Sequence, residues 1–320
     1  MNTNHKKTFT KYYLLQVEEI MVDSISFGNL YQDKTQKATF DLLNKVNDKN
    51  KMSQKIIKLE SLESANTMDL PLVNPELEGT SFFLEGGDVG VLLLHGLTAT
   101  TAEVRPLAKR LHNAGFTVSS PLLPGHGTTP ENLNQTHRTE WTAACEKAYL
   151  ELKKKCSQIF VGGESAGGLL ALHLASEHPE IKGILLFAPA MRLASSFLYT
   201  FFWVLASPFV LSIQKNVEDN KDCMAWQGYK VNPLKAGVQL LKLQRETQLR
   251  LCRIYQPILI IQANLDKTVD LKSGDMILQG VQSAVRESHW MEKSRHVVIL
   301  DKEFQEVAEI TLKFIEKLIH

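Results

Sequence analysis

The stretch VGGESAGG, residues 161–168, places a single serine among small residues at the end of an apolar run. The run IFV, residues 159–161, leads into it, and LLALHLA, residues 169–175, follows. A short apolar run bounded by glycines predicts a strand, and the longer run after the glycines predicts a helix. The pattern therefore indicates a strand, a sharp turn and a helix, with Ser165 at the turn.

The five residues around Ser165 have the form G-x-S-x-G, which suits a nucleophilic serine. Glycines on both sides permit a tight turn that lifts the hydroxyl off the end of a sheet. The first N–H groups of the following helix would face negative charge that forms nearby. A phosphate-binding turn is the main alternative, but the chain has no G-x-G-x-x-G, and no Lys follows as in a P-loop. We therefore expect Ser165 to be a nucleophile.

Apolar runs and helical patterns alternate from about residue 86 onward. Alternation of this kind predicts an α/β fold, in which a mostly parallel sheet is covered by helices on both faces. The expected strands lie at residues 89–94, 116–118, 158–161, 183–187, 257–261 and 287–291. The expected helices lie at residues 102–114, 141–154, 271–281 and 304–319, besides the one that follows Ser165.

Two parts of the chain depart from this alternation. Residues 1–75 are rich in Lys, Asn, Asp and Thr, with a broken helical pattern of apolar residues. We expect them to form an N-terminal extension, helical or partly disordered, that acts as a solvated appendage or a docking arm. Residues 76–320 are expected to form the α/β domain, with an insertion at about 191–253.

The first half of the insertion could in principle cross a membrane. Residues 193–214 carry no charge and are long enough to span a bilayer. They also include Pro208 and five Ser or Thr residues, and they lie between two parts of one expected domain. We therefore favour a lid, either buried or facing lipid, over a transmembrane span.

Composition excludes several classes of function. The net charge of the 320 residues is +1, which gives no reason to expect nucleic acid as a partner. His and acidic residues are not spaced as metal ligands, so neither a metal nor a cofactor is expected. The four cysteines are dispersed and the N-terminus has no secretory pattern, so free thiols and a cytoplasmic location are expected. The cysteines are Cys145, Cys156, Cys223 and Cys252.

A second chemical signal is LHGL, residues 94–97, at the end of the first long apolar strand. A serine nucleophile needs two N–H donors for the oxyanion of its tetrahedral intermediate. The N–H of Ala166, next to Ser165, can be one, and the N–H of Leu97 is placed to be the other. The imidazole of His95 fits a packed turn better than a catalytic role.

Four stretches together resemble the α/β-hydrolase superfamily, and within it the small microbial carboxylesterases and monoacylglycerol lipases. The resemblance extends over most of residues 88–320 and does not include the first 75. It implies an α/β-hydrolase fold with a helical cap in the insertion, and hydrolysis of carboxylic esters. The stretches are LLLHGLTATTAEVRPLAKRLHNAGFTV, PLLPGHGTTPENL with Trp141 downstream, FVGGESAGGLLALHLA, and IIQANLDKTV followed by SRHVVILD.

The resemblance also implies a catalytic triad in the chain order Ser, Asp, His. Asp266 matches the D-x-x-V pattern that follows the penultimate strand, with Asp270 and Asp275 as rivals. His296 lies in the expected loop after the last strand, with His289 as its rival. His296 would then accept the proton of Ser165, and Asp266 would orient the imidazole.

Aromatic residues in the insertion suggest the substrate. Phe197, Phe201 and Trp203 could line an acyl pocket, contact a lipid surface, or simply pack within the cap. We expect medium or long acyl esters, with peripheral membrane contact through the cap or the extension left open. The alternatives are a thioesterase or other acyl hydrolase, and a catalytically silent binding protein of the same fold.

Overall fold

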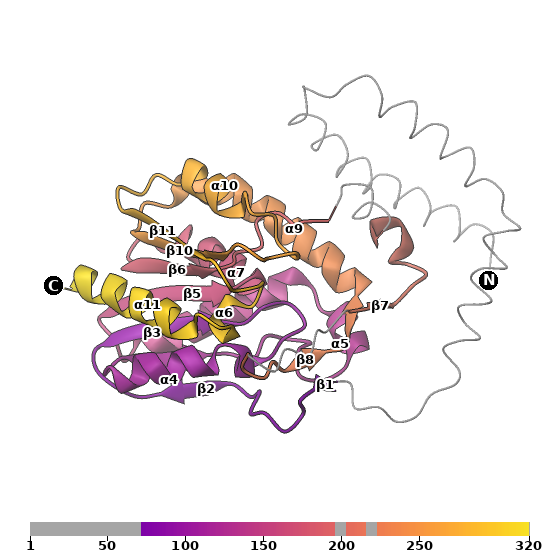
Figure 1. Cartoon of the computed structure of the whole chain (residues 1–320), viewed down its shortest axis with the longest axis horizontal. Coiled ribbons are helices and arrows are strands. Elements are labelled where there is room, and N and C mark those ends of the chain that lie inside the picture. The colour runs from indigo at the N-terminus through magenta and orange to yellow at the C-terminus, as the bar shows by residue number, and fades with distance from the viewer. Residues whose placement is uncertain (1–71, 196–202, 216–222, 320) are drawn as a thin grey trace, which may run out of the picture. The chain divides into compact units, whose positions relative to one another are not determined.

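Seven strands form the central sheet of the computed structural model, which describes residues 72–195, 203–215 and 223–319 (Figure 1). Their order across the sheet is β11-β10-β6-β5-β3-β4-β2. All neighbours are parallel except β2, which pairs antiparallel with β4 at one edge. The strands are β2 (Phe82–Leu84), β3 (Val89–Leu94), β4 (Thr117–Ser120), β5 (Gln158–Glu164), β6 (Gly183–Phe187), β10 (Ile258–Ala263) and β11 (Arg286–Met291).

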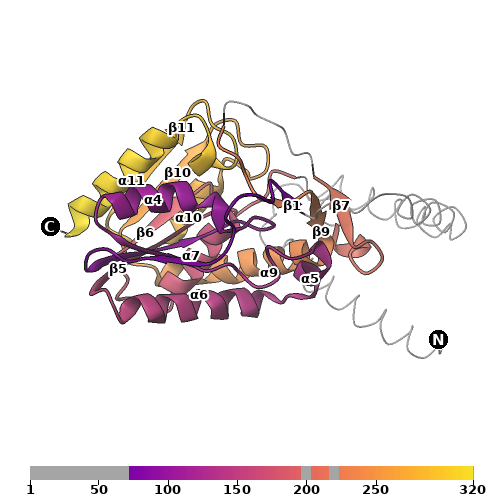
Figure 2. The same ribbon diagram turned by 90° about the horizontal axis from the view of Figure 1, so that it is seen from below.

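Helices cover both faces of this sheet, as the sequence predicts (Figure 2). Successive residues of β3 point to opposite faces, because side chains alternate along a strand. Leu92 and Leu94 pack with α6, α7, α9 and α10 in one core, while Val91 and Leu93 pack with α4 and α11 in the other. The helices are α4 (Arg105–Asn113), α6 (Arg138–Lys153), α7 (Ala166–Ala175), α9 (Leu234–Arg250), α10 (Ser273–Gly280) and α11 (Phe304–Ile319).

Two helices differ in extent from the sequence prediction. Residues 102–114 do not form one helix: the 3-10 turn η1 (Thr101–Glu103) precedes α4, which has a proline in its first turn. Helix α6 begins at Arg138, before the predicted start at residue 141. His137 caps it, and Glu140 bonds back to the N–H of His137 at 2.7 Å. This reciprocal capping fixes the start of a helix more firmly than its apolar pattern does.

The chain between β6 and β10 forms the insertion. Its described parts include β7 (Ser212–Gln214), which pairs with β9 (Val231–Pro233), and β8 (Gly228–Tyr229), which pairs with β1 (Leu72–Val73). Helix α9 closes the insertion and packs against α7. The short helices α5 (Pro130–Gln135), η2 (Leu251–Arg253) and η3 (Val298–Leu300) complete the described elements.

The N-terminal extension falls outside the described residues, apart from its last few positions. The extent of the extension therefore stays a prediction. The limits of the insertion, at about residues 191 and 253, stay a prediction as well. Of residues 193–214, positions 196–202 are likewise undescribed. None of the helices in the described ranges combines the length and hydrophobicity needed to cross a bilayer.

The turn between β5 and α7 brings backbones closer than side chains would allow. A Cβ atom on Gly163 would lie 2.4 Å from the carbonyl carbon of Gly167. A Cβ atom on Gly167 would lie 2.0 Å from the oxygen of Leu94, the last residue of β3. The glycines on both sides of Ser165 are therefore required by backbone packing as well as by the turn itself.

We predict that Gly167→Ala lowers the free energy of unfolding by about 1–3 kcal/mol, because the new methyl group meets a backbone carbonyl that cannot rotate away. Gly237→Ala in α9 is the matched control, since its Cβ would meet nothing closer than Trp203 at 3.5 Å. The control should be neutral or stabilising by up to about 1 kcal/mol. Urea unfolding of both variants checks this, and equal stabilities would contradict it.

Candidate active site

Ser165 occupies a strained position between β5 and α7. Its φ of 53° and ψ of −111° lie outside the regions that a non-glycine residue ordinarily adopts. Hydrogen bonds hold this turn: the N–H of Ser165 donates to the oxygen of Phe187 at 2.9 Å. The backbone carbonyl oxygen of Ser165 accepts the N–H groups of Gly168 and Ala190, each at 3.1 Å. Such strain persists only where the surroundings fix it, and it is frequent at active sites.

A hydrogen-bonded chain links Ser165 to His296 and Asp266. The hydroxyl of Ser165 lies 2.9 Å from Nε2 of His296, and Nδ1 of His296 lies 2.8 Å from Oδ2 of Asp266. Asp266 can only accept, so it assigns the proton of the neutral ring to Nδ1 and leaves Nε2 free to accept from the hydroxyl. The structure thus brings together the three residues that the sequence analysis selected.

The carboxylate of Asp266 is itself held in place. Its side chain is 4 % exposed, and that of His296 is 19 % exposed. Oδ1 of Asp266 accepts the N–H groups of Thr268 at 2.7 Å and Val269 at 2.9 Å. Oδ2 is therefore left to face the imidazole, which orients the ring toward Ser165.

The rival residues have other partners. Asp270 accepts the N–H of Lys272 at 2.9 Å and pairs with Arg192 at 3.1 Å. His289 lies on β11, where its Nε2 is 2.8 Å from Glu287. Asp275 lies in the first turn of α10. The structure connects none of these rivals to Ser165 by a hydrogen bond within its described parts.

The two predicted oxyanion donors flank Ser165. Ala166 is the first residue of α7, directly after the serine. Leu97 follows Gly96, where a Cβ atom would lie only 3.5 Å from the Cβ of Ser165. Within the described residues, neither the N–H of Leu97 nor that of Ala166 has a hydrogen-bond acceptor. Both donors are therefore available for an oxyanion at Ser165.

His95 anchors this loop from behind. Its Nε2 accepts the N–H of Leu123 at 3.1 Å, so the proton of the neutral ring sits on Nδ1 and is donated to the oxygen of Gly96 at 2.9 Å. Burial lowers the pKa of His95 to about 4, which keeps the ring neutral. His126 packs edge-on against it, with ring centroids 4.9 Å apart. These contacts describe a structural histidine.

Of the predicted substrate-binding residues, only Trp203 falls within the described chain. Its indole lies close to Gly237 of α9, because a Cβ atom there would be 3.5 Å from the ring. Phe197 and Phe201 lie outside the described residues. Contact of these three side chains with substrate stays a prediction.

A buried carboxyl beside Ser165 was missed by the sequence analysis. Glu164 is fully buried, and neither of its oxygens has a hydrogen-bond partner of ordinary geometry within the described parts; the backbone N–H of Ile299 lies near enough only to oppose part of the effect of burial. Burial raises its pKa well above the ordinary 4.5, and the nearby carboxyls of Glu103 and Asp266 raise it further. An unpaired buried carboxylate is costly, so the group takes up a proton instead. The only signal in the sequence was an acidic residue at the end of an apolar strand.

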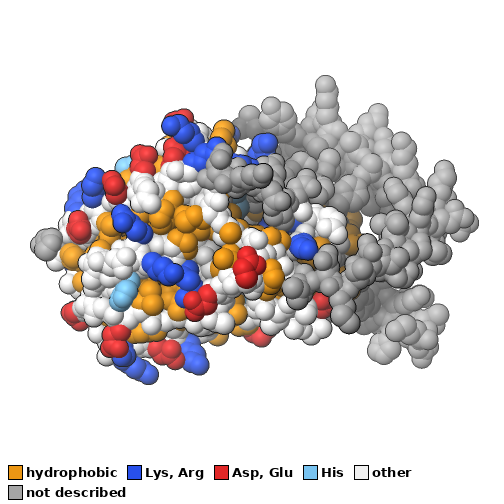
Figure 3. Space-filling model, turned by 60° about the horizontal axis from the view of Figure 1, so that its bottom comes forward, with side chains coloured by type: hydrophobic (Ala, Val, Ile, Leu, Met, Phe, Trp, Pro, Cys, Tyr) orange, Lys and Arg blue, Asp and Glu red, His pale blue; other side chains and the backbone are white. Residues whose placement is uncertain are grey.

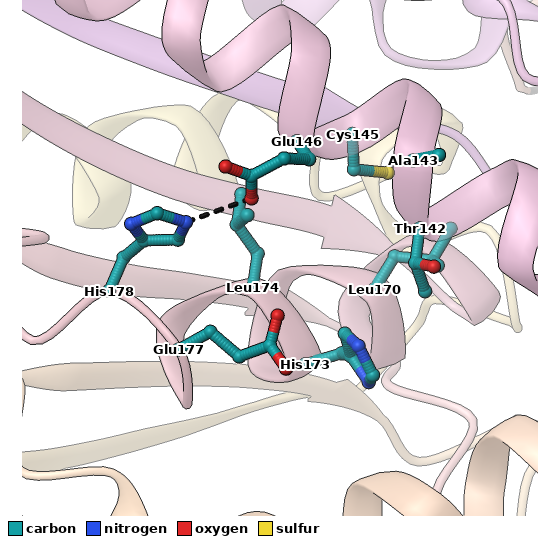
Figure 4. Close-up of a pocket in the computed structure, with 9 residues that line it drawn as sticks. All are labelled: Thr142, Ala143, Cys145, Glu146, Leu170, His173, Leu174, Glu177 and His178. Carbon is teal, nitrogen blue, oxygen red and sulfur yellow. Dashed lines mark hydrogen bonds and ion pairs between the residues drawn. The ribbon is translucent and has the colours of Figure 1, made fainter.

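A surface cavity of about 440 Å³ lies between α6 and α7 (Figure 4). Leu170 and Leu174 line it together with Glu177 and His178, and His178 is bonded to Glu146 at 2.8 Å. Ser165, Asp266 and His296 are not among its lining residues, so this cavity is separate from the hydrogen-bonded chain.

Across the described ranges, no group of three or more His, Cys, Asp or Glu residues could hold a metal ion.

Comparisons with known proteins agree with this geometry. A family model described as serine aminopeptidase, S33, matches residues 88–303. The chain is 36% identical over 244 residues to a thermostable monoacylglycerol lipase from Bacillus sp. (strain H-257). The matched region covers 76% of this chain and 97% of that protein. It is 33% identical over 239 residues to a carboxylesterase from Bacillus subtilis (strain 168), covering 74% of this chain and 96% of that protein.

A solved structure is also similar. It comes from work on LipS and LipT, two metagenome-derived lipolytic enzymes, and matches with a TM-score of 0.68 and 32% identity. The match covers 75% of this chain and 99% of that one. Fold and sequence thus agree over the same part of the chain.

Replacing Glu164 by Gln should change how stability depends on pH. With its raised pKa, the folded protein keeps a proton that the unfolded chain releases above about pH 4.5. Wild-type stability should therefore fall, relative to Glu164→Gln, as the pH rises above that value. Well below pH 4.5, the difference in free energy of unfolding between wild type and Glu164→Gln should be constant. Urea unfolding across this range measures it.

Glu180→Gln is the control with the opposite sign. Lys153 holds the pKa of Glu180 at about 2, so its carboxylate stabilises the fold above the unfolded pKa of 4.5. Glu180→Gln should lose stability relative to wild type as the pH rises from about 2 to 4.5, and the difference should stay constant above 4.5. A flat difference curve for Glu164→Gln would contradict the assignment of a neutral carboxyl.

Proposed function

The chain belongs to the serine aminopeptidase S33 family of α/β-hydrolases, and we propose that it hydrolyses carboxylic esters through an acyl-enzyme formed on Ser165. The observation that carries the proposal is the hydrogen-bonded chain from Asp266 through His296 to Ser165, at 2.8 and 2.9 Å. A serine hydroxyl is a weak nucleophile at neutral pH and needs such an adjacent base.

The acylation half of the reaction follows from this geometry. Ser165 Oγ attacks the ester carbonyl carbon while its proton passes to Nε2 of His296. The carbonyl oxygen becomes an oxyanion that accepts the N–H groups of Leu97 and Ala166, each worth roughly 3 kcal/mol in such sites. When the intermediate collapses, the ester C–O bond breaks and the imidazolium gives its proton to the leaving alcohol. Asp266 stabilises the imidazolium throughout.

Deacylation repeats these steps with water as the nucleophile. His296 takes a proton from water, the hydroxide attacks the acyl carbon, and the same two N–H groups hold the oxyanion. Ser165 then leaves with the proton from Nε2, and the carboxylic acid is released. The proposed cycle consumes only ester and water and uses no cofactor.

Medium or long acyl esters are the proposed substrates, as in a carboxylesterase or monoacylglycerol lipase. The relatives named above support this class. The apolar insertion supports it too, since Phe197, Phe201 and Trp203 would offer aromatic surface to an acyl chain. Hydrolysis of thioesters or other acyl groups uses the same triad and is the alternative within this fold.

Contact with a lipid surface and a cytoplasmic location stay predictions. Phe209 is 75 % exposed and Leu211 is 51 % exposed, which favours contact of the insertion with lipid. Co-sedimentation with lipid vesicles tests this contact. The face in Figure 3 mixes positive and negative side chains among hydrophobic ones.

Loss of either triad side chain should abolish turnover while the rivals are dispensable. His296→Ala and Asp266→Asn should each lower kcat for a p-nitrophenyl ester by roughly 10⁴-fold, because the base or its orientation is lost. The matched controls His289→Ala and Asp270→Asn should keep wild-type kcat. Steady-state kinetics on folded variants decides between them, and an inactive His289→Ala with an active His296→Ala would reverse the assignment.

The acyl preference should increase with chain length beyond acetate. Each further buried methylene contributes about 0.8 kcal/mol, or roughly fourfold in kcat/KM, until the pocket is filled. A series of p-nitrophenyl esters from acetate to palmitate, assayed below the micelle concentration, measures this. An optimum at acetate would remove the proposed acyl pocket.

A further inference from the structure

The loop that carries Leu97 is strained and needs support. Thr98 has a φ of 68°, a left-handed conformation that a β-branched side chain rarely adopts. The oxygen of Thr98 accepts the N–H of Tyr229 at 2.9 Å, and its Oγ1 lies 3.2 Å from Nζ of Lys215. Both partners belong to the insertion between β6 and β10. The shape of the loop therefore depends on a distant part of the chain.

Glu103 connects the other side of this loop to the same insertion. The residue is 3 % exposed, and each carboxyl oxygen accepts one N–H group. Oε2 accepts the backbone N–H of Gly96 at 2.6 Å, and Oε1 accepts the indole N–H of Trp226 at 2.9 Å. A Cβ atom at position 96 would lie 3.2 Å from Oε2, so glycine lets the carboxylate approach closely. The Glu103 side chain thus ties the loop at Gly96 to Trp226, which lies 123 residues beyond Glu103 in the chain.

Burial raises the pKa of Glu103 above its ordinary value, and the surrounding donors and cations offset part of that rise. They are the N–H groups of Gly96 and Trp226 and the positive charges of Lys215 and of protonated His296. Nζ of Lys215 lies 4.0 Å from the centre of the Trp226 ring. The indole therefore has an ammonium over its face and a carboxylate at its N–H edge, and both interactions hold it in one orientation.

We propose that Glu103 is a positioning residue: it holds the N–H of Gly96, and so fixes the backbone from which the next N–H, that of Leu97, faces the oxyanion formed at Ser165. Trp226 extends this support to the insertion, so that the insertion also sets the shape of the oxyanion loop. The inference rests on the proposed function, because it assigns a role to a residue that does not touch the reacting atoms.

The two peptide groups that meet at Gly96 are each held by one hydrogen bond. The N–H of Gly96, in the peptide that joins it to His95, donates to Glu103. The oxygen of Gly96, in the next peptide, which also carries the N–H of Leu97, accepts from Nδ1 of His95 at 2.9 Å. If the carboxylate is removed, the N–H of Gly96 becomes a buried donor without an acceptor, and the peptide between His95 and Gly96 is released to rotate. Rotation of that peptide shifts the Cα of Gly96 and with it the following peptide, so the N–H of Leu97 changes direction, which weakens oxyanion binding more than ground-state binding.

The test compares Glu103→Ala, Glu103→Gln and Trp226→Phe in the full chain. We expect Glu103→Ala to lower kcat for a p-nitrophenyl ester by about 10- to 100-fold with little change in KM, because misaiming one oxyanion donor costs up to about 10³-fold. Glu103→Gln should lie between Ala and wild type, since one carbonyl oxygen can satisfy only part of the two N–H groups. Trp226→Phe, which removes the indole N–H and keeps an aromatic ring at this position, should also lower kcat.

A trifluoromethyl ketone inhibitor supplies a readout specific to the oxyanion. It adds to the serine as a tetrahedral adduct, so its affinity should fall in parallel with kcat/KM across the three variants. Gln256→Ala is the matched control, because Gln256 is buried and also joins two carbonyl groups, those of Ala175 and His178, at 2.8 and 2.9 Å. It should lower Tm and leave kcat and inhibitor affinity unchanged.

Wild-type kcat and inhibitor affinity in both Glu103→Gln and Trp226→Phe would overturn the inference, even if Glu103→Ala does not fold. A loss confined to KM, or one matched by Gln256→Ala, would overturn it as well. Ser165→Ala separates this failure from failure of the proposed function. If Ser165→Ala retains turnover, the nucleophile is wrong; if it is inactive while the Glu103 and Trp226 variants are unaffected, only the present inference fails.

Discussion

The hydrogen-bonded chain from Asp266 through His296 to Ser165 is the interaction on which the proposed chemistry of this protein depends. An alcohol loses its proton at neutral pH only if a base is already aligned with it. The alignment needs two contacts of 2.8 and 2.9 Å between residues that come from three separate loops. A displacement of 1 Å in any of these loops can cost about 10²-fold in rate.

The parallel sheet supplies this precision. Leu97, Ser165, Asp266 and His296 follow β3, β5, β10 and β11, and the carboxyl ends of parallel strands meet at one edge of a sheet. Strained backbone collects at that edge. Thr98, Ser165 and Ala188, three of the four non-glycine residues with positive φ in the described chain, come after β3, β5 and β6. Hydrogen bonds across neighbouring loops hold these conformations, so that the site is shaped before substrate arrives.

Sequence patterns predicted the local features of this arrangement and missed the long-range ones. The strand, turn and helix around Ser165 follow from G-x-S-x-G and its apolar flanks. Asp266 and His296 followed from family resemblance, since nothing local distinguishes Asp266 from Asp270. The contact of Glu103 with Trp226 has no local signature, because 123 residues separate the two side chains. Residues 102–114 were predicted as one helix, whereas the structure ends a short turn at Glu103 and begins α4 at Arg105, with Pro106 in its first turn.

Covalent labelling with a fluorophosphonate probe tests the central claim most directly. The probe reacts only with a serine whose hydroxyl is activated and whose oxyanion donors are in place. Peptide mapping of the labelled protein should find stoichiometric modification of Ser165, with the rate of labelling greatly reduced in His296→Ala. Labelling of another residue, or an unlabelled and folded wild-type protein, would contradict the assignment of Ser165 as an activated nucleophile.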